Sequence, residues 1–226
     1  QGDTTPEPLL HWKKMSLELF IFDLDGTLID SKLDLALAVN AVRVRAGMTP
    51  LAPEIVYSHV GNGAPVLIRR CLGLETPSDL IEEGVQFFYT YYREHMLDNT
   101  DLYPGVRYTL DKLLEQGKPM AVLTNKPVRF SEGIIAGLGL TDHFKRVYGG
   151  NSFASKKPDP KGINLLMEEL SVPRLQTLMV GDSAVDVETA RNAQVRCCGV
   201  TYGLQPESFK RQPPDFLIDR MEDLLA

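Results

Sequence analysis

Two aspartates near the start of the chain are the first residues with an evident chemical capacity. Asp23 and Asp25 directly follow the apolar run at 20–22. Because they lie two positions apart at the end of an extended segment, their side chains project to the same side. Two carboxylates held so close repel each other unless a cation or a proton relieves them. Mg2+ prefers oxygen ligands and keeps room for substrate oxygens, so this pair predicts a magnesium site.

Two more acidic residues follow another apolar run far downstream. Asp182 comes shortly after the run at 178–180, and Asp186 lies one helical turn beyond it and faces the same way. Taken singly, Asp182 is more simply explained as a helix cap. A set of four aspartates that follow two apolar runs is difficult to explain as unrelated caps. We therefore expect one site built from several carboxylates.

Polar residues that suit a phosphoryl group stand between the acidic clusters. Thr124 and Asn125 follow the apolar run at 120–123, where a hydroxyl and the N–H groups of a helix start can bind a phosphoryl oxygen. Lys157 precedes a proline that restrains its loop. The alternatives are an ordinary N-cap at Thr124 and a solvated lysine. The order of Asp, Asp, Thr, Lys and Asp along the chain favours the phosphoryl site.

A parallel sheet is needed to bring these residues together. Short apolar runs alternate with helical segments from residue 102 onward, which predicts right-handed parallel crossovers. Ligands bind at the carboxyl ends of such strands, where the polar clusters lie. We predict an α/β fold with a Rossmann-like, doubly wound parallel sheet. The expected strands are at about 17–22, 120–123, 146–149, 177–180, 196–200 and 215–218.

A helical segment interrupts this pattern after the first aspartates. Between residues 29 and 101 no strand pattern appears, and helical spacing is found instead. Asp30 or Ser31 is the expected N-cap of the first helix, and the aromatic residues at 89–92 are expected to pack inside the segment. The expected organisation is a flexible tail at 1–14, a core of 15–29 plus 102–226, and a small helical cap at 30–101.

The charge and composition of the chain limit the kinds of molecule that it is expected to bind. The chain of 226 residues has a formal net charge of −6, which disfavours nucleic acid and anionic membranes, because both require a basic face. No apolar stretch approaches the ~20 residues that a membrane helix needs. Three cysteines give no disulfide framework, a usage typical of a reducing cytosol. We expect a cytoplasmic protein that acts on a small molecule.

The ordered polar clusters resemble the four motifs of the haloacid dehalogenase superfamily of aspartate-nucleophile phosphotransferases. The segment 23–27 (DLDGT) is similar to the first motif, Thr124 to the second, Lys157 to the third, and 181–186 (GDSAVD) to the fourth. The resemblance extends from residue 17 to the C-terminus. A helical insertion after the first motif is similar to the small cap of the subgroup that includes phosphoglycolate phosphatases, and the segments 60–64 and 124–127 also resemble that subgroup.

The resemblance implies roles for the acidic residues. Asp23 would attack phosphorus and form an aspartyl-phosphate. Asp25 would protonate the departing alkoxide and then take a proton from the hydrolytic water. The Mg2+ ligands would be the side chains of Asp23 and Asp182 and the backbone carbonyl of Asp25. Asp186 and Ser183 would support this site.

The resemblance also implies which residues bind the substrate. Thr124, the backbone of Asn125 and Lys157 would stabilise the transferring phosphoryl group. Lys156 is the alternative if the loop register differs. The dehalogenase members lack a residue like Asp25, because a halide leaving group needs no proton, so its presence favours phosphoryl transfer.

The cap would act as a lid that excludes bulk water and contributes specificity. The candidates for substrate selection are Gly61, Asn62 and Gly63, with His59 or Arg69 as further possibilities. The alternative is that this segment is only a connection between two helices.

These features together predict a Mg2+-dependent phosphomonoester hydrolase that acts on a small phosphorylated metabolite. The resemblance makes 2-phosphoglycolate the expected substrate. The enzymatic alternatives are a sugar-phosphate phosphatase and a mutase similar to β-phosphoglucomutase. A phospho-receiver signalling module is the non-enzymatic alternative, but such a module needs neither a lid nor an acid for the leaving group.

Overall fold

Strand β1 (Leu19–Phe22) lies inside a six-stranded parallel sheet with the order β5-β4-β1-β6-β7-β8. Taken in chain order, these strands are arranged 3-2-1-4-5-6, the Rossmann arrangement, so the predicted sheet is confirmed. The computed structural model describes residues 16–225, and the tail predicted at 1–14 lies outside them. The other strands are β4 (Met120–Leu123), β5 (Arg146–Tyr148), β6 (Thr177–Gly181), β7 (Arg196–Val200) and β8 (Phe216–Ile218).

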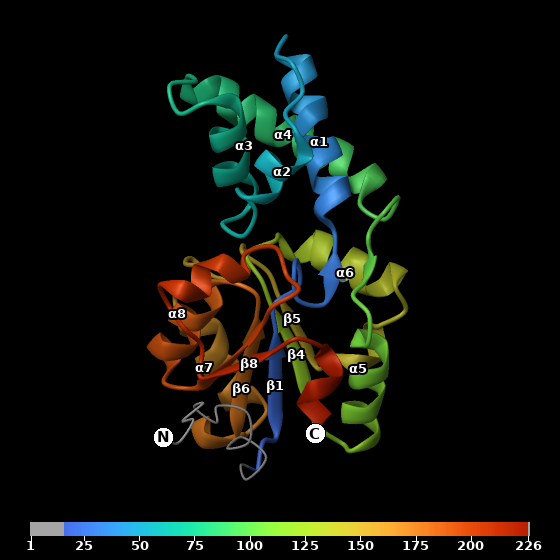
Figure 1. Cartoon of the computed structure of the whole chain (residues 1–226), viewed down its shortest axis with the longest axis vertical. Helices are drawn as coiled ribbons and strands as arrows, with labels where there is room; N and C mark the ends of the chain where they lie inside the picture. The colour runs from blue at the N-terminus through green and yellow to red at the C-terminus, as the bar shows by residue number, and fades with distance from the viewer. Residues whose placement is uncertain (1–15, 226) are drawn as a thin grey trace, which may run out of the picture.

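Helices cover both faces of the sheet because its strands are apolar on both sides (Figure 1). Along β1, Phe20 and Phe22 belong to one hydrophobic cluster, while Leu19 and Ile21 belong to another. Since burial of one large apolar side chain stabilises a fold by roughly 1.5–3 kcal/mol, both clusters hold the helices in place. The first cluster includes α5 (Val106–Glu115) and α6 (Val128–Gly137), and the second includes α7 (Lys161–Glu169) and α8 (Ala184–Ala193).

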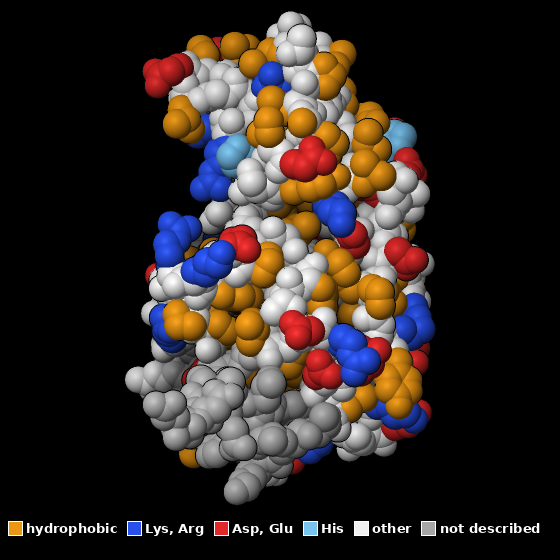
Figure 2. All heavy atoms as spheres, viewed as in Figure 1, with side chains coloured by type: hydrophobic (Ala, Val, Ile, Leu, Met, Phe, Trp, Pro, Cys, Tyr) orange, Lys and Arg blue, Asp and Glu red, His pale blue; other side chains and the backbone are white. Residues whose placement is uncertain are grey.

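Four helices lie beyond the carboxyl ends of the strands, at the top of Figure 1. We call this segment, residues 32–95, the cap, and the sheet with its helices the core. Figure 2 shows a notch between the two parts on the left edge, with Lys and Arg side chains on both sides of it. The cap helices are α1 (Lys32–Arg45), α2 (Pro53–Tyr57), α3 (Ala64–Leu72) and α4 (Ser78–His95).

A short two-stranded ribbon joins the cap to the core. β2 (Ile29–Asp30) pairs antiparallel with β3 (Asp101–Leu102). The expectation of no strand pattern between 29 and 101 is wrong at its two ends, because strands of two residues are too short to show alternation. Asp25 forms a bridge with Ile29. Both chain crossings into the cap therefore lie beside the end of β1.

Several smaller features complete the described chain. Cys71, Cys197 and Cys198 are buried and unpaired, in agreement with the absence of a disulfide framework. Within residues 16–225, none of the helices combines the length and apolarity that crossing a bilayer demands. The 3-10 helices are η2 (Thr141–His143), η3 (Arg174–Gln176), η4 (Pro206–Lys210) and η5 (Met221–Leu225).

Candidate active site

Three buried carboxylates meet at the carboxyl ends of two neighbouring strands. Asp23 follows β1, Asp182 follows β6, and Asp186 lies in the first turn of α8. One oxygen from each lies within 4.8 Å of the others, and all three side chains are buried. The N–H of Asp23 donates to the carbonyl oxygen of Val180 at 2.9 Å. The pairing of β1 with β6 thus brings together motifs that are far apart in the sequence.

Lys157 is the cation of this cluster. Its Nζ lies 2.8 Å from Asp23 Oδ1 and 2.6 Å from Asp186 Oδ1. Burial disfavours the ammonium, but Asp186 and Asp23 outweigh burial and raise the pKa of Lys157. Lys156, the alternative, instead donates to the carbonyl oxygen of Asn62 in the cap at 2.5 Å. The structure therefore places Lys157, and not its neighbour, among the carboxylates.

The charge of the cluster fits a divalent cation. Burial raises the pKa of Asp23 to about 6 although Lys157 opposes it, and burial, Asp186 and Asp23 raise the pKa of Asp182. Asp23 Oδ1 accepts no hydrogen bond of good geometry despite its contact with the lysine. Three carboxylates beside a single lysine repel one another. An oxygen-binding cation would remove this repulsion, and Asp23 and Asp182 are suitable ligands for it.

Asp182 is held by a loop from another part of the core. Its Oδ2 accepts N–H bonds from Leu204 at 2.7 Å and Gln205 at 3.2 Å. Gly26, at φ +83°, packs so closely that a Cβ there would lie 2.3 Å from this oxygen. The glycine of the first motif is therefore needed both for its turn and for the approach of Asp182.

Asp186 both caps a helix and contacts the lysine of the cluster. Its Oδ2 accepts bonds from the N–H of Ser183 at 3.1 Å and from the Ser183 hydroxyl at 2.7 Å. The first of these bonds belongs to a capping box at the start of α8, in which the Ser183 side chain in turn accepts the backbone N–H of Asp186. The other oxygen of Asp186 is the one that pairs with Lys157. The helix cap thus fixes the carboxylate that orients the lysine.

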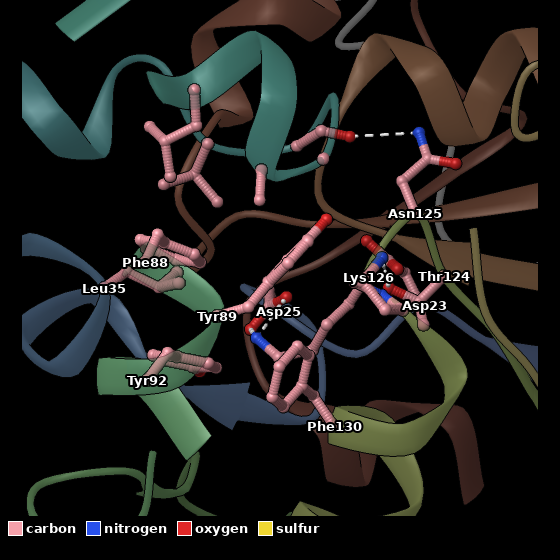
Figure 3. A pocket seen from close by; sticks show the side chains of 16 residues that line it. Asp23, Asp25, Leu35, Phe88, Tyr89, Tyr92, Thr124, Asn125, Lys126 and Phe130 are labelled. Carbon is pink, nitrogen blue, oxygen red and sulfur yellow. Dashed lines mark hydrogen bonds and ion pairs between the residues drawn. The ribbon is translucent and has the colours of Figure 1, made fainter. Parts of the chain in front are cut away.

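Asp25 lies beside the cluster and is held by two side chains. Lys126 Nζ lies 2.8 Å from Oδ1 and 3.0 Å from Oδ2 of Asp25, as Figure 3 shows. The Ser31 hydroxyl donates to Oδ1 at 2.5 Å. Ser31 is the N-cap residue of α1 but makes no side-chain cap bond. Ser31 is thus the N-cap by position, as one of the two predicted alternatives, but its hydroxyl is directed at the aspartate, and the Asp30 side chain accepts the Lys32 N–H at 3.4 Å instead.

Lys126 is the residue that sequence reasoning missed. It is 7% exposed, and its side chain reaches Asp25. The sequence signals were its position directly after Thr124 and Asn125 and its place in the segment 124–127, which resembles the phosphoglycolate phosphatase subgroup. A lysine in such a place gives no indication of burial, since most lysines are solvated.

The residues after β4 connect the core to the cap. Thr124 Oγ1 accepts the Lys126 N–H at 3.2 Å. The Asn125 side chain donates to the carbonyl oxygens of Gly61 at 3.1 Å and Lys157 at 3.2 Å, and Figure 3 shows the first of these bonds. Thr124 and Asn125 therefore lie where they were expected. The side chain of Asn125 additionally bridges to the cap.

A cavity of about 50 Å³ opens between these residues and the cap. Gly61 and Gly63 line it, whereas Asn62, His59 and Arg69 are not among the described residues that do. The expectation that residues 89–92 only pack inside the cap is incomplete. Tyr92 stacks on Phe88, and both rings also line the cavity, together with Tyr89 and Phe130 (Figure 3).

Comparison with known proteins identifies the family. The family model described as haloacid dehalogenase-like hydrolase matches residues 20–200. The chain belongs to this family. It is 39% identical over 219 residues to a phosphoglycolate phosphatase of Vibrio parahaemolyticus, with 94% of this chain and 96% of the relative covered. It is 41% identical over 214 residues to a phosphoglycolate phosphatase of Pseudomonas putida, with 92% and 78% covered.

A solved structure supports the same assignment. The crystal structure of a predicted phosphoglycolate phosphatase from Haemophilus somnus superposes with a TM-score of 0.89 at 32% identity. The superposition covers 94% of this chain and 98% of the other. The resemblance to the haloacid dehalogenase superfamily that the motifs predicted is confirmed.

In this haloacid dehalogenase-like hydrolase, two aspartates with different surroundings face one cavity. Asp23 lies in the acidic cluster beside Lys157. Asp25 lies outside that cluster and contacts Lys126 and Ser31. In such a pair, one aspartate can act as a nucleophile while the other carries a proton.

Proposed function

We propose that this protein is a Mg2+-dependent phosphomonoester hydrolase whose substrate is 2-phosphoglycolate. The observation that carries the proposal is the pair formed by Asp23 and Asp25 on one cavity. A second aspartate is useful only when the leaving group needs a proton, which an ester alkoxide does. The names of the relatives from Vibrio parahaemolyticus and Pseudomonas putida support the choice of substrate.

In the proposed reaction, an oxygen of Asp23 attacks phosphorus while the bond between phosphorus and the ester oxygen breaks. Asp25, which takes up a proton before this step, donates it to the departing glycolate oxygen. Water then attacks phosphorus of the aspartyl-phosphate, Asp25 takes the proton of that water, and inorganic phosphate leaves with Asp23 restored. Atoms and protons balance in each half-reaction. Asp25 donates a proton in the first and accepts a proton in the second.

The surrounding residues would stabilise the charge that develops on the phosphoryl oxygens. Lys157, the Thr124 hydroxyl and the N–H groups that follow β4 supply fixed donors for this purpose. A Mg2+ ion held by Asp23, Asp182 and the carbonyl of Asp25 would neutralise phosphoryl charge.

The shape of the cavity is compatible with a small leaving group. Its enclosed part is about 50 Å³, which corresponds to a few water molecules and suits a short tail such as that of glycolate. A cytosolic location stays a prediction from the use of cysteine.

The test is phosphate release by the purified protein in the presence of Mg2+. We expect the highest kcat/KM for 2-phosphoglycolate, compared with glucose 6-phosphate and β-glucose 1-phosphate. Faster turnover of either sugar phosphate would contradict the proposed substrate. Isomerisation of β-glucose 1-phosphate without phosphate release would instead identify a mutase, and a stable phosphoprotein would identify a receiver module.

A further inference from the structure

The cavity contains one positive charge. Among the described residues that line it, Lys126 is the only cation, and Asp23 and Asp25 are the acidic residues. The remaining lining is backbone, small polar groups and apolar or aromatic side chains. Of the described residues that line the cavity, Lys126 is therefore the one that can neutralise an anionic group entering it beyond the phosphoryl site.

Lys126 is held as a charged donor at this place. Its Nζ contacts both oxygens of Asp25 and lies 4.7 Å from the centroid of the Tyr92 ring. Burial disfavours the ammonium, but Asp25 and Tyr92 outweigh burial and raise the pKa of Lys126. An ammonium has three N–H donors, and Asp25 takes two of them. The hydroxyl of Tyr92 is buried beside this lysine and makes no hydrogen bond of good geometry.

The chemistry of glycolate requires two recognition groups side by side. Its leaving oxygen and its carboxylate are bonded to the same carbon, so the proton donor and the partner of the carboxylate must be neighbours. Lys126 Nζ lies 2.8 Å from Asp25 Oδ1, so these two residues satisfy this requirement. A sugar phosphate or a simple alcohol phosphate carries no anion next to the leaving oxygen and would leave the ammonium without a new partner.

We propose that Lys126 determines specificity by binding the carboxylate of the leaving group, an inference that rests on the proposed phosphoglycolate phosphatase activity. The substrate carboxylate accepts a hydrogen bond from Nζ while the leaving oxygen lies at Asp25. The Tyr92 hydroxyl is the second donor within reach. The class of substrate is therefore a phosphate ester whose ester carbon itself carries the carboxylate.

The test compares 2-phosphoglycolate with its amide, which is nearly identical in size but has a neutral tail. The wild-type protein is expected to prefer the carboxylate by about 10- to 100-fold in kcat/KM, mainly through KM. In Lys126→Met the preference falls to about unity. A residue that only positions Asp25 would lower the rates on both esters equally and leave the preference unchanged.

Two further variants make the result independent of a single substitution. Lys156→Met removes a lysine that binds the cap without lining the cavity, and it is expected to keep the preference. Lys126→Arg retains the positive charge and is expected to keep most of the preference for 2-phosphoglycolate over its amide. If Lys126→Met fails to fold, Lys126→Gln serves in its place, and the amide still tests recognition of the carboxylate in the wild-type protein.

The outcomes separate the two proposals. Equal rates on 2-phosphoglycolate and its amide in the wild type would leave the phosphatase activity standing but overturn carboxylate recognition. A preference that survives in Lys126→Met would overturn the role of this lysine alone. A wild-type protein that releases no phosphate from 2-phosphoglycolate would refute the proposed function, and the inference would fall with it.

Discussion

Asn125 donates a hydrogen bond from Nδ2 to the carbonyl oxygen of Gly61 at 3.1 Å, and thereby ties the loop after β4 to the cap. Two other core loops make similar bonds to the same stretch of cap backbone, from Lys156 to Asn62 and from Gln205 to Val60. Each of these donors adjoins a candidate site residue or contacts one. The three bonds therefore join the cap to the loops that hold the candidate site residues.

The substitution Gln205→Ala is predicted to weaken the contact between the cap and the core. The backbone N–H of Gln205 still serves Asp182, so the acidic cluster stays intact while the bond to Val60 is lost. The loss of one such bond costs about 0.5–1.5 kcal/mol, which corresponds to a rise in KM of about 2- to 10-fold. Steady-state kinetics of phosphate release measures this change. Gln116→Ala, on the exposed end of α5, is the matched control, and an equal KM in both variants would contradict the prediction.

The substitution Asp23→Asn is predicted to abolish turnover and to preserve the fold. Asparagine has nearly the same shape, but its amide oxygen is not an effective nucleophile toward phosphorus. We expect phosphate release to fall by at least about 10³-fold, in line with the loss of a covalent catalyst. The same substitution at the exposed Asp142 should leave the rate unchanged. Circular dichroism checks the fold, and near-normal turnover in Asp23→Asn would exclude Asp23 as the nucleophile.

Stability without metal is predicted to depend on pH through Asp23. Burial raises its pKa from 3.8 to about 6. Between these values the native state holds a proton that the unfolded state has released, so the free energy of unfolding falls as pH rises. Above pH 6 this contribution is gone, a loss of about 3 kcal/mol at most. Urea unfolding in EDTA from pH 4 to 7 measures it. Asp23→Asn has no carboxyl group to titrate at this position. If its free energy of unfolding changed with pH in the same way as that of the wild type, the prediction would be contradicted.

The sequence predicted the sheet well because its strands are buried on both faces. The strands 120–123 and 196–200 were expected at their observed bounds, since continuous apolar runs between helices leave little ambiguity. The candidate residues of the acidic cluster and of the phosphoryl site also followed from the predicted parallel sheet, because the carboxyl ends of its strands lie at one edge. The catalytic roles of Asp23, Asp25 and Asp182 stay predictions.

Other features depend on contacts that no local pattern encodes. The ribbon of β2 and β3 forms only when the two crossings meet. Ser31 has the local signature of a helix cap, yet its hydroxyl bonds Asp25. Lys126 becomes buried only because α4 brings Tyr92 over it. In each case a tertiary partner decides what the side chain does.

Removal of divalent metal is predicted to stop catalysis. EDTA should abolish phosphate release and added Mg2+ should restore it, because the acidic cluster needs a compensating cation. The substitution Asp182→Asn keeps an oxygen for the N–H groups of Leu204 and Gln205 but removes a charge. We expect it to raise the Mg2+ concentration for half-maximal activity by at least about tenfold. Unchanged rates in EDTA would disprove the metal requirement.

The substitution Lys157→Met is predicted to destabilise the protein as well as inactivate it. Lys157 is the cation that contacts Asp23 and Asp186, so its removal leaves buried carboxylates uncompensated. Breaking a buried ion pair from one side costs about 3–5 kcal/mol, which urea unfolding in EDTA at pH 7 can measure. The exposed Lys145→Met is the control and should stay within about 0.5 kcal/mol of wild type.

A second substitution separates lost charge balance from lost packing. Asp186→Asn combined with Lys157→Met removes one of the stranded carboxylates, so the double variant should regain part of the stability that the single variant loses. Mg2+ should stabilise Lys157→Met more than it stabilises the wild type, because the metal then supplies the missing positive charge. If the double variant is less stable than Lys157→Met, the carboxylate of Asp186 contributes through the capping box of α8 more than it costs in repulsion.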